Sequence, residues 1–176
     1  MRIFRLGFFR QVATFVLALV LVACAASSSQ PWHSFSFDGR FDKWADQVDL
    51  LAYSYGDKYN MVRNSIDQPR SPAYEGLRQL PPATGINGPM PVGDFLYVKW
   101  RVKATGEVIE DKVDLRNLLP QNMFDHGLTF VIDGRQLYVY LVTPKFKKYG
   151  DPPQLKTYLS NHHVTYEIYP NNTYKH

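Results

Sequence analysis

The sequence contains a single cysteine among 176 residues, Cys24. One thiol cannot form an intramolecular disulfide or a multi-cysteine metal site, so the hydrophobic core must hold the folded domain together. No H-E-x-x-H motif or carboxylate–histidine cluster suggests a metal ligand set. We therefore expect neither a metal nor a cofactor.

Acidic residues are absent from the first 23 positions, which carry Arg2, Arg5 and Arg10. The apolar run from Val12 to Ala23 has twelve residues, whereas a membrane-spanning helix needs about 20. A basic start, a short apolar run and small residues at its end are typical of a secretory signal peptide. Residues 1–23 are therefore predicted to be a signal peptide, with an uncleaved membrane anchor as the alternative.

The only cysteine lies directly after this run, in Leu21-Val22-Ala23-Cys24. This motif resembles the lipobox of bacterial lipoproteins, with an ordinary apolar cysteine as the alternative. The resemblance implies signal cleavage between Ala23 and Cys24, a diacylglycerol on the sulfur and an acylated amino group. Several acyl chains hold a domain on a membrane without a spanning helix. Ala25, in place of Asp, implies by resemblance to enterobacterial lipoproteins an outer-membrane location facing the periplasm.

The formal charge of +4 depends largely on the predicted signal peptide. Without its three arginines, 17 basic and 16 acidic side chains remain. A basic face is the electrostatic signature of nucleic-acid binding, so we do not expect a nucleic-acid partner. Residues 24–31, which are small and polar after the cysteine, are predicted to tether one domain, residues 32–176.

Two hairpins dominate the pattern of that domain. Apolar residues alternate over 94–103 and return over 108–115, with Gly106 in the turn. A second hairpin joins 128–132 to 136–142 through Asp133-Gly134, a strong hairpin signal. Weaker strands are expected at 47–56 and 163–170, and short helices at 41–48 and 152–161.

Residues 56–93 contain six prolines and five glycines and are predicted to form a long loop that is functional or mobile. The whole pattern predicts a mainly β fold of about six to eight strands with one or two short helices. An antiparallel β-sandwich and a partly open barrel both remain possible.

No catalytic set emerges from the sequence. Ser54 lies in Ala-Tyr-Ser-Tyr-Gly, which lacks the first glycine and the following helix of a nucleophile elbow. His162 and His163 are adjacent, so on a strand they point to opposite faces. The simplest interpretation of the isolated histidines and of a spaced row of acids is a structural or solvated role. These residues are His33, His126, His176, Asp38, Asp42, Asp46 and Asp49. We therefore expect a protein that is not an enzyme.

Aromatic residues are abundant instead, with 12 Tyr, 11 Phe and 3 Trp. Four of them alternate with core positions on the predicted hairpins and are candidates either for partner binding or for core packing: Phe95, Tyr97, Tyr138 and Tyr140. Tyrosine is enriched in protein-binding surfaces. The predicted loop offers a second candidate surface, formed by Tyr74, Leu77, Arg78 and Met90.

The segments PVGDFLYVKWRVKATGEVIEDKVDLRNLLP and FVIDGRQLYVYLVTP, within residues 91–144, resemble small proteobacterial lipoproteins found near type VI secretion components and their phospholipase effectors. The resemblance implies an immunity or inhibitor protein that binds such an effector at the membrane. A structural or assembly lipoprotein of an envelope or secretion complex is the alternative, and a hydrolase or small-ligand carrier is a third.

Overall fold

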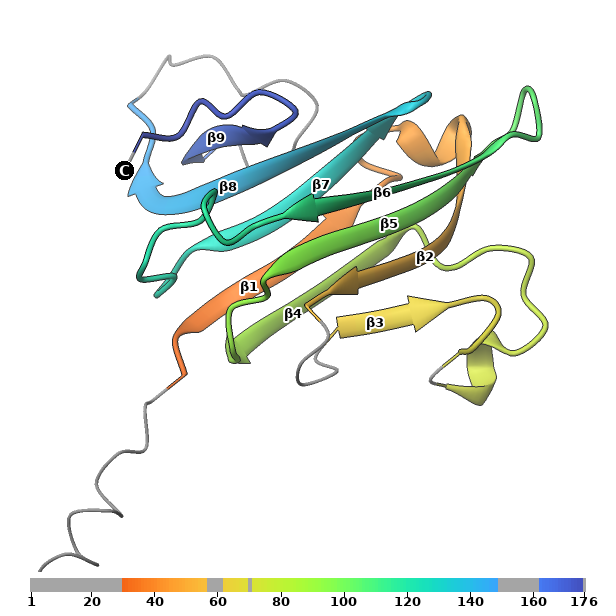
Figure 1. Cartoon of the computed structure of the whole chain (residues 1–176), viewed down its shortest axis with the longest axis horizontal. Coiled ribbons are helices and arrows are strands. Elements are labelled where there is room, and N and C mark those ends of the chain that lie inside the picture. Colours follow the sequence, from red (N-terminus) through yellow and green to blue (C-terminus); the bar gives the residue numbers. More distant parts are fainter. Residues whose placement is uncertain (1–29, 57–61, 70, 149–161, 176) are drawn as a thin grey trace, which may run out of the picture.

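Nine strands form two sheets that face each other in the computed structural model, which describes residues 30–56, 62–69, 71–148 and 162–175 (Figure 1). The strands are β1 Trp32–Asp38, β2 Val48–Tyr55, β3 Val62–Ser65, β4 Ala83–Pro89, β5 Phe95–Val102, β6 Val108–Asp114, β7 Gly127–Asp133, β8 Gln136–Phe146 and β9 His163–Tyr169. One sheet has the order β4-β1-β7-β8-β9 and the other β3-β2-β5-β6.

The predicted mainly β fold is thus confirmed, and of the two architectures that the sequence left open it is the sandwich, with three corrections of detail. The described residues contain nine strands where six to eight were expected. The sheets are antiparallel except for one parallel pair, β1 with β7. Within the described part of the chain, the helices are two single 3₁₀ turns, η1 Trp44–Asp46 and η2 Pro72–Tyr74.

Both predicted hairpins are present. β5 pairs with β6 in antiparallel register, and β7 pairs with β8 in the same way. Gly106 and Gly134 have φ values of 73° and 58° in the two turns. This left-handed conformation is easily adopted only by glycine, so these two residues fix where each chain reversal occurs.

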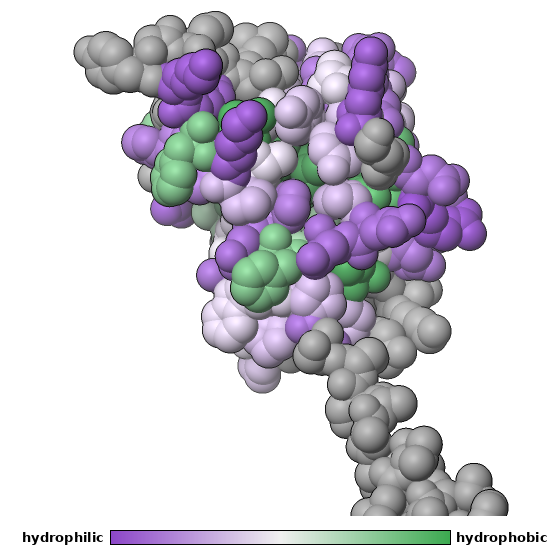
Figure 2. All heavy atoms as spheres, turned by 90° about the vertical axis from the view of Figure 1, so that its left-hand side faces the viewer, coloured by the Kyte–Doolittle hydropathy of each residue, from purple (hydrophilic) through white to green (hydrophobic). Residues whose placement is uncertain are grey.

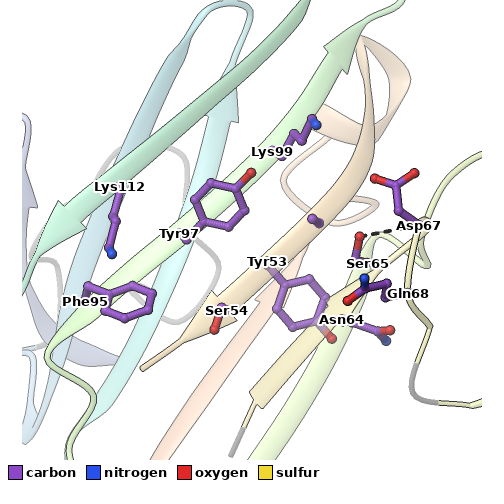
Figure 3. Close-up of a pocket in the computed structure, with 11 residues that line it drawn as sticks. Tyr53, Ser54, Asn64, Ser65, Asp67, Gln68, Phe95, Tyr97, Lys99 and Lys112 are labelled. Carbon is purple, nitrogen blue, oxygen red and sulfur yellow. Dashed lines mark hydrogen bonds between the residues drawn. The ribbon is translucent and has the colours of Figure 1, made fainter. Parts of the chain in front are cut away.

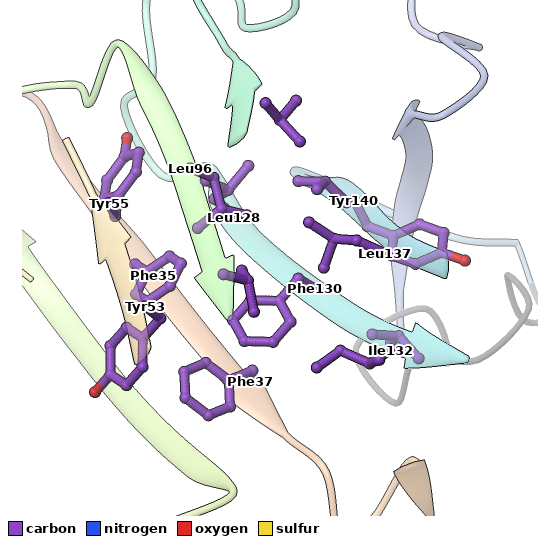
Figure 4. Packing of buried hydrophobic residues seen from close by; sticks show 14 of the residues in the cluster. Phe35, Phe37, Tyr53, Tyr55, Leu96, Leu128, Phe130, Ile132, Leu137 and Tyr140 are labelled. Atoms are coloured by element: carbon purple, nitrogen blue, oxygen red, sulfur yellow. The ribbon is translucent and has the colours of Figure 1, made fainter. Parts of the chain in front are cut away.

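Aromatic rings from both sheets fill the space between them (Figure 4). Phe35 of β1 stacks on Tyr55 of β2 with ring centroids 5.3 Å apart, and Phe37 meets Tyr53 edge-to-face at 5.0 Å. The ring centroid of Phe130, on β7, lies 4.5 Å from that of Phe37. Such offset and edge contacts add to the stabilisation that burial itself provides.

The predicted long loop at 56–93 is wrong, because it contains β3 and β4. β4 includes Gly85, Gly88 and Pro89 and is mostly exposed, so it carries no hydrophobic alternation. It is an edge strand, where proline is tolerated, and seven consecutive residues pair with β1.

Some predictions lie outside the described residues: the signal peptide, Ala23, Cys24 and the helix at 152–161. None of the helices in the described ranges is long and apolar enough to cross a membrane.

Candidate functional site

A hollow of about 550 Å³ opens on the outer face of the β3-β2-β5-β6 sheet (Figure 3). It is lined by Ala52, Tyr53, Ser54, Asn64, Ser65, Asp67, Gln68, Phe95, Tyr97, Lys99 and Lys112. This volume falls within the range of ligand-binding clefts. We call this set of residues the sheet hollow.

The hollow exists because the middle of the sheet carries small side chains. On β2, Ala52 pairs with Lys99 and Ser54 pairs with Tyr97. Small residues beside long ones on the neighbouring strand leave a depression. The segment after β3, with Asp67, forms the opposite wall.

Phe95 and Tyr97 project from β5 on the face opposite the buried Leu96, Val98 and Trp100. This placement follows from the two-residue period of a strand. Both rings are half-buried rather than core residues. They are the two candidate binding residues that the structure brings together in the hollow (Figure 3).

Diagonal contacts with β6 hold both rings in place. The Tyr97 hydroxyl donates a hydrogen bond to Oε2 of Glu110 at 2.7 Å. The ammonium of Lys112 lies 4.0 Å from the centre of the Phe95 ring, in a cation–π contact. The aromatic wall is therefore oriented before any partner binds, which lowers the entropic cost of binding.

The hydroxyl of Tyr97 stays protonated at neutral pH. Burial, followed by the hydrogen bond to Glu110, raises the pKa of Tyr97 to about 12. The side chain therefore acts as a neutral donor. Lys99, Lys112 and Asp67 all line the hollow, so side chains of both charges border it.

An unpaired acceptor lies at the β3 side of the hollow. Oδ1 of Asn64 is buried and has no hydrogen-bond partner among the described residues. Such a group costs free energy unless a donor reaches it. Nearby, Ser65 Oγ accepts a hydrogen bond from the Asp67 backbone N–H.

The other candidate binding residues lie elsewhere. Tyr138 and Tyr140 point away from the Leu137 side of β8, as expected, but Tyr140 is only 1% exposed and Tyr138 is half-buried. Met90 is also a core residue, with 6% exposure. Tyr140 and Met90 therefore cannot contribute to a surface.

Tyr74, Leu77 and Arg78 lie on and just after η2, between β3 and β4. Tyr74 is half-buried, whereas Leu77 and Arg78 are exposed. Ser71 caps this turn by accepting a hydrogen bond from the Ala73 N–H. These three residues remain a second candidate surface.

Ser54 and Asp38, which the sequence singled out, make local hydrogen bonds in the described part of the chain. The Ser54 hydroxyl lies in the hollow but donates to the carbonyl of Gly56 at 2.8 Å. Among the described residues, no group of three His, Cys, Asp or Glu side chains could hold a metal ion. Asp38 instead accepts hydrogen bonds from the backbone N–H groups of Arg40 and Phe41.

One buried polar pair was not anticipated. His33 is 1% exposed, and its Nε2 lies 3.1 Å from the Tyr55 hydroxyl across the sandwich. Its Nδ1 contacts the carbonyl of Pro31 at 3.0 Å. Burial lowers the pKa of His33, so the ring is neutral in the folded protein at neutral pH. The alternation of His33, Phe35 and Phe37 was the signal that these residues share a buried face.

No protein-family model, curated protein or solved structure matches this chain.

Proposed function

We propose that this chain is a lipid-anchored protein of the bacterial envelope that binds a protein partner through the sheet hollow. The observation that supports it best is the aromatic wall of Phe95 and Tyr97, held by Lys112 and Glu110 on an otherwise open sheet face. Rigid aromatic side chains next to a depression are the usual centre of a protein interface.

The partner that we propose is a secreted effector such as a type VI phospholipase, which the chain would neutralise. The resemblance within residues 91–144 supports this choice. Among the described residues, the lining of the hollow includes no histidine or cysteine. The Ser54 hydroxyl donates to a backbone carbonyl and the Ser65 hydroxyl accepts from a backbone N–H, which supports binding rather than catalysis.

Anchoring through Cys24 supports the same function. A phospholipase acts at a membrane surface, and an inhibitor tethered there meets it at a raised effective concentration. Moderate affinity would then be enough to compete with the lipid substrate.

The test is protection of cells that express the full chain and receive the effector encoded beside it. Tyr97→Ala should weaken effector binding at least tenfold, because an interface hot spot is worth about 2 kcal/mol or more. Leu77→Ala, an exposed apolar residue of the loop surface, is the matched control. Loss of binding in the Leu77 variant alone would move the site to the loop.

A second arm tests the anchor. Cys24→Ser, exported with a conventional signal peptide, should protect less well at equal abundance. Equal protection would exclude anchoring from the mechanism. Two results together would instead support an assembly role. Envelope components would be recovered with the wild-type chain, and Tyr97→Ala would not change the binding of an effector.

A further inference from the structure

Within the described ranges, half of the large exposed apolar side chains lie at one end of the sandwich. At this end β1, β7 and β9 begin and β4 and β8 end, as the strand pairings require. Figure 2 looks toward this end and shows hydrophobic atoms at the surface among hydrophilic ones. We call it the β1 end. Its exposed apolar residues are Trp32, Val92, Phe124 and Phe146.

Backbone hydrogen bonds bring three of these residues together. The N–H of Asp125 donates to the carbonyl of Trp32 at 2.8 Å, which places Phe124 beside β1. The N–H of Met90 donates to the carbonyl of Pro31 at 3.3 Å, and Val92 follows two residues later. Trp32 is 48% exposed, Phe124 55% and Val92 38%.

The fourth residue lies at the end of β8 and is the most exposed. Phe146 is 72% exposed and is flanked in the sequence by Lys145, Lys147 and Lys148. Aromatic residues next to lysines are typical of segments that lie at a membrane interface. Anionic lipids attract such basic segments.

The short length of the chain between Cys24 and the domain indicates that the β1 end meets a membrane. Seven residues separate Cys24 from Trp32, so the eight residue steps of a fully extended tether span at most about 29 Å. The tether joins the domain at the β1 end. The opposite end lies one strand length farther away, about 26 Å for the eight residues of β5. The β1 end therefore reaches the membrane with a slack tether, whereas the opposite end reaches it only when the tether is almost fully extended.

We infer that the β1 end is a second membrane contact, in which Trp32, Phe124 and Phe146 enter the lipid interface and orient the domain. This inference rests on the proposed lipid anchor at Cys24. Tryptophan and phenylalanine suit this position because the transfer of their rings from water to the interface is favourable. The contact restricts rotation of the domain about its tether.

Tryptophan fluorescence tests the contact directly. The sequence has three tryptophans; Trp44 and Trp100 are 2% and 1% exposed, so Trp32 alone can respond to lipid. The full chain, purified with its native modification, is reconstituted into vesicles of phosphatidylethanolamine and phosphatidylglycerol. A second sample uses the same lipids brominated close to the headgroup.

The expected result is quenching of tryptophan emission by brominated lipid, and its loss in Trp32→Phe. Phe124→Ser should reduce the quenching. Val108→Ser should leave the quenching unchanged, because Val108 is as exposed as Trp32, at 48%, but begins β6 at the opposite end. The unchanged emission of the buried tryptophans confirms folding of each variant.

Flotation of the vesicles separates the two proposals. A chain that floats with the vesicles but shows no quenching is anchored without the second contact, which overturns this inference alone. A chain that does not float lacks the anchor, which overturns both. Quenching that survives Trp32→Phe would also contradict the inference, because it would come from another region of the protein.

Discussion

Removal of one hydroxyl group should measure how strongly the two sheets are joined at the β1 end. Tyr55 is fully buried, and its hydroxyl lies 3.1 Å from Nε2 of His33 on the facing sheet. Burial raises the pKa of Tyr55 to about 12, with an opposing contribution from a hydrogen bond to the Gly93 backbone. The hydroxyl is therefore protonated and hydrogen-bonded inside the core.

Tyr55→Phe removes these hydrogen bonds but keeps the ring and its stacking on Phe35 at 5.3 Å. His33 Nε2 is then left buried without its partner. Leaving a buried polar group unsatisfied costs about 1–3 kcal/mol, and we expect the free energy of unfolding to fall by this amount. Urea denaturation at pH 7.5 (roughly one unit above the usual histidine pKa), followed by tryptophan fluorescence, measures it.

Tyr53→Phe is the matched control. Tyr53 lies two residues earlier on β2, also in the core and 7% exposed. Its hydroxyl has no hydrogen bond that lies within the described residues, so we expect a change below about 0.5 kcal/mol, as for substitutions that remove no buried contact. A Tyr55→Phe protein as stable as wild type, or equal losses in both variants, would refute the reasoning.

Two further changes act on the same end of the molecule. Gly93→Ala should destabilise the fold by about 1–3 kcal/mol, because the added Cβ would lie 2.6 Å from the Tyr55 ring and 2.9 Å from the Gly56 nitrogen. Gly85→Ala is the control in the same denaturation assay, since a Cβ at Gly85 has no atom within 4 Å. Burial lowers the pKa of His33 from 6.5, so the unfolded chain binds more protons than the folded one once the pH falls below about 6.5. The free energy of unfolding should therefore fall in that range, and less steeply in His33→Gln; equal slopes in the two proteins would contradict the assignment.

The sequence predicted the parts of the fold in which local signals agree with the final packing. β5 with β6, and β7 with β8, combine alternation with a turn that needs glycine, so each hairpin is specified by adjacent residues. β4 could not be found in this way. Its residues, Ala83–Pro89, are mostly exposed, and the strand is defined by backbone pairing with β1, more than 40 residues away in the chain.

Only two of the eleven residues that line the hollow, Phe95 and Tyr97, were predicted as binding residues, for a similar reason. Alternation on β5 places Phe95 and Tyr97 opposite the core, and they line the hollow. The same pattern on β8 could not show that Tyr140 is buried, because burial depends on what covers the outer face of the sheet. Ala52 and Ser54 carry no signal of their own, since a hollow arises only from their position beside β5.

The two proposed surfaces lie at right angles, and this arrangement has a functional consequence. β5 begins with Phe95 at the β1 end and runs toward the opposite end, so the hollow lies along the side of the sandwich. If the β1 end rests on lipid, the hollow opens parallel to the membrane, with Phe95 closer to the lipid than Lys99. A partner in the hollow would then stand on the same membrane surface. This is the position of an interfacial enzyme that approaches its lipid substrate, so orientation by Trp32 would favour binding of an effector already at the membrane over one in solution.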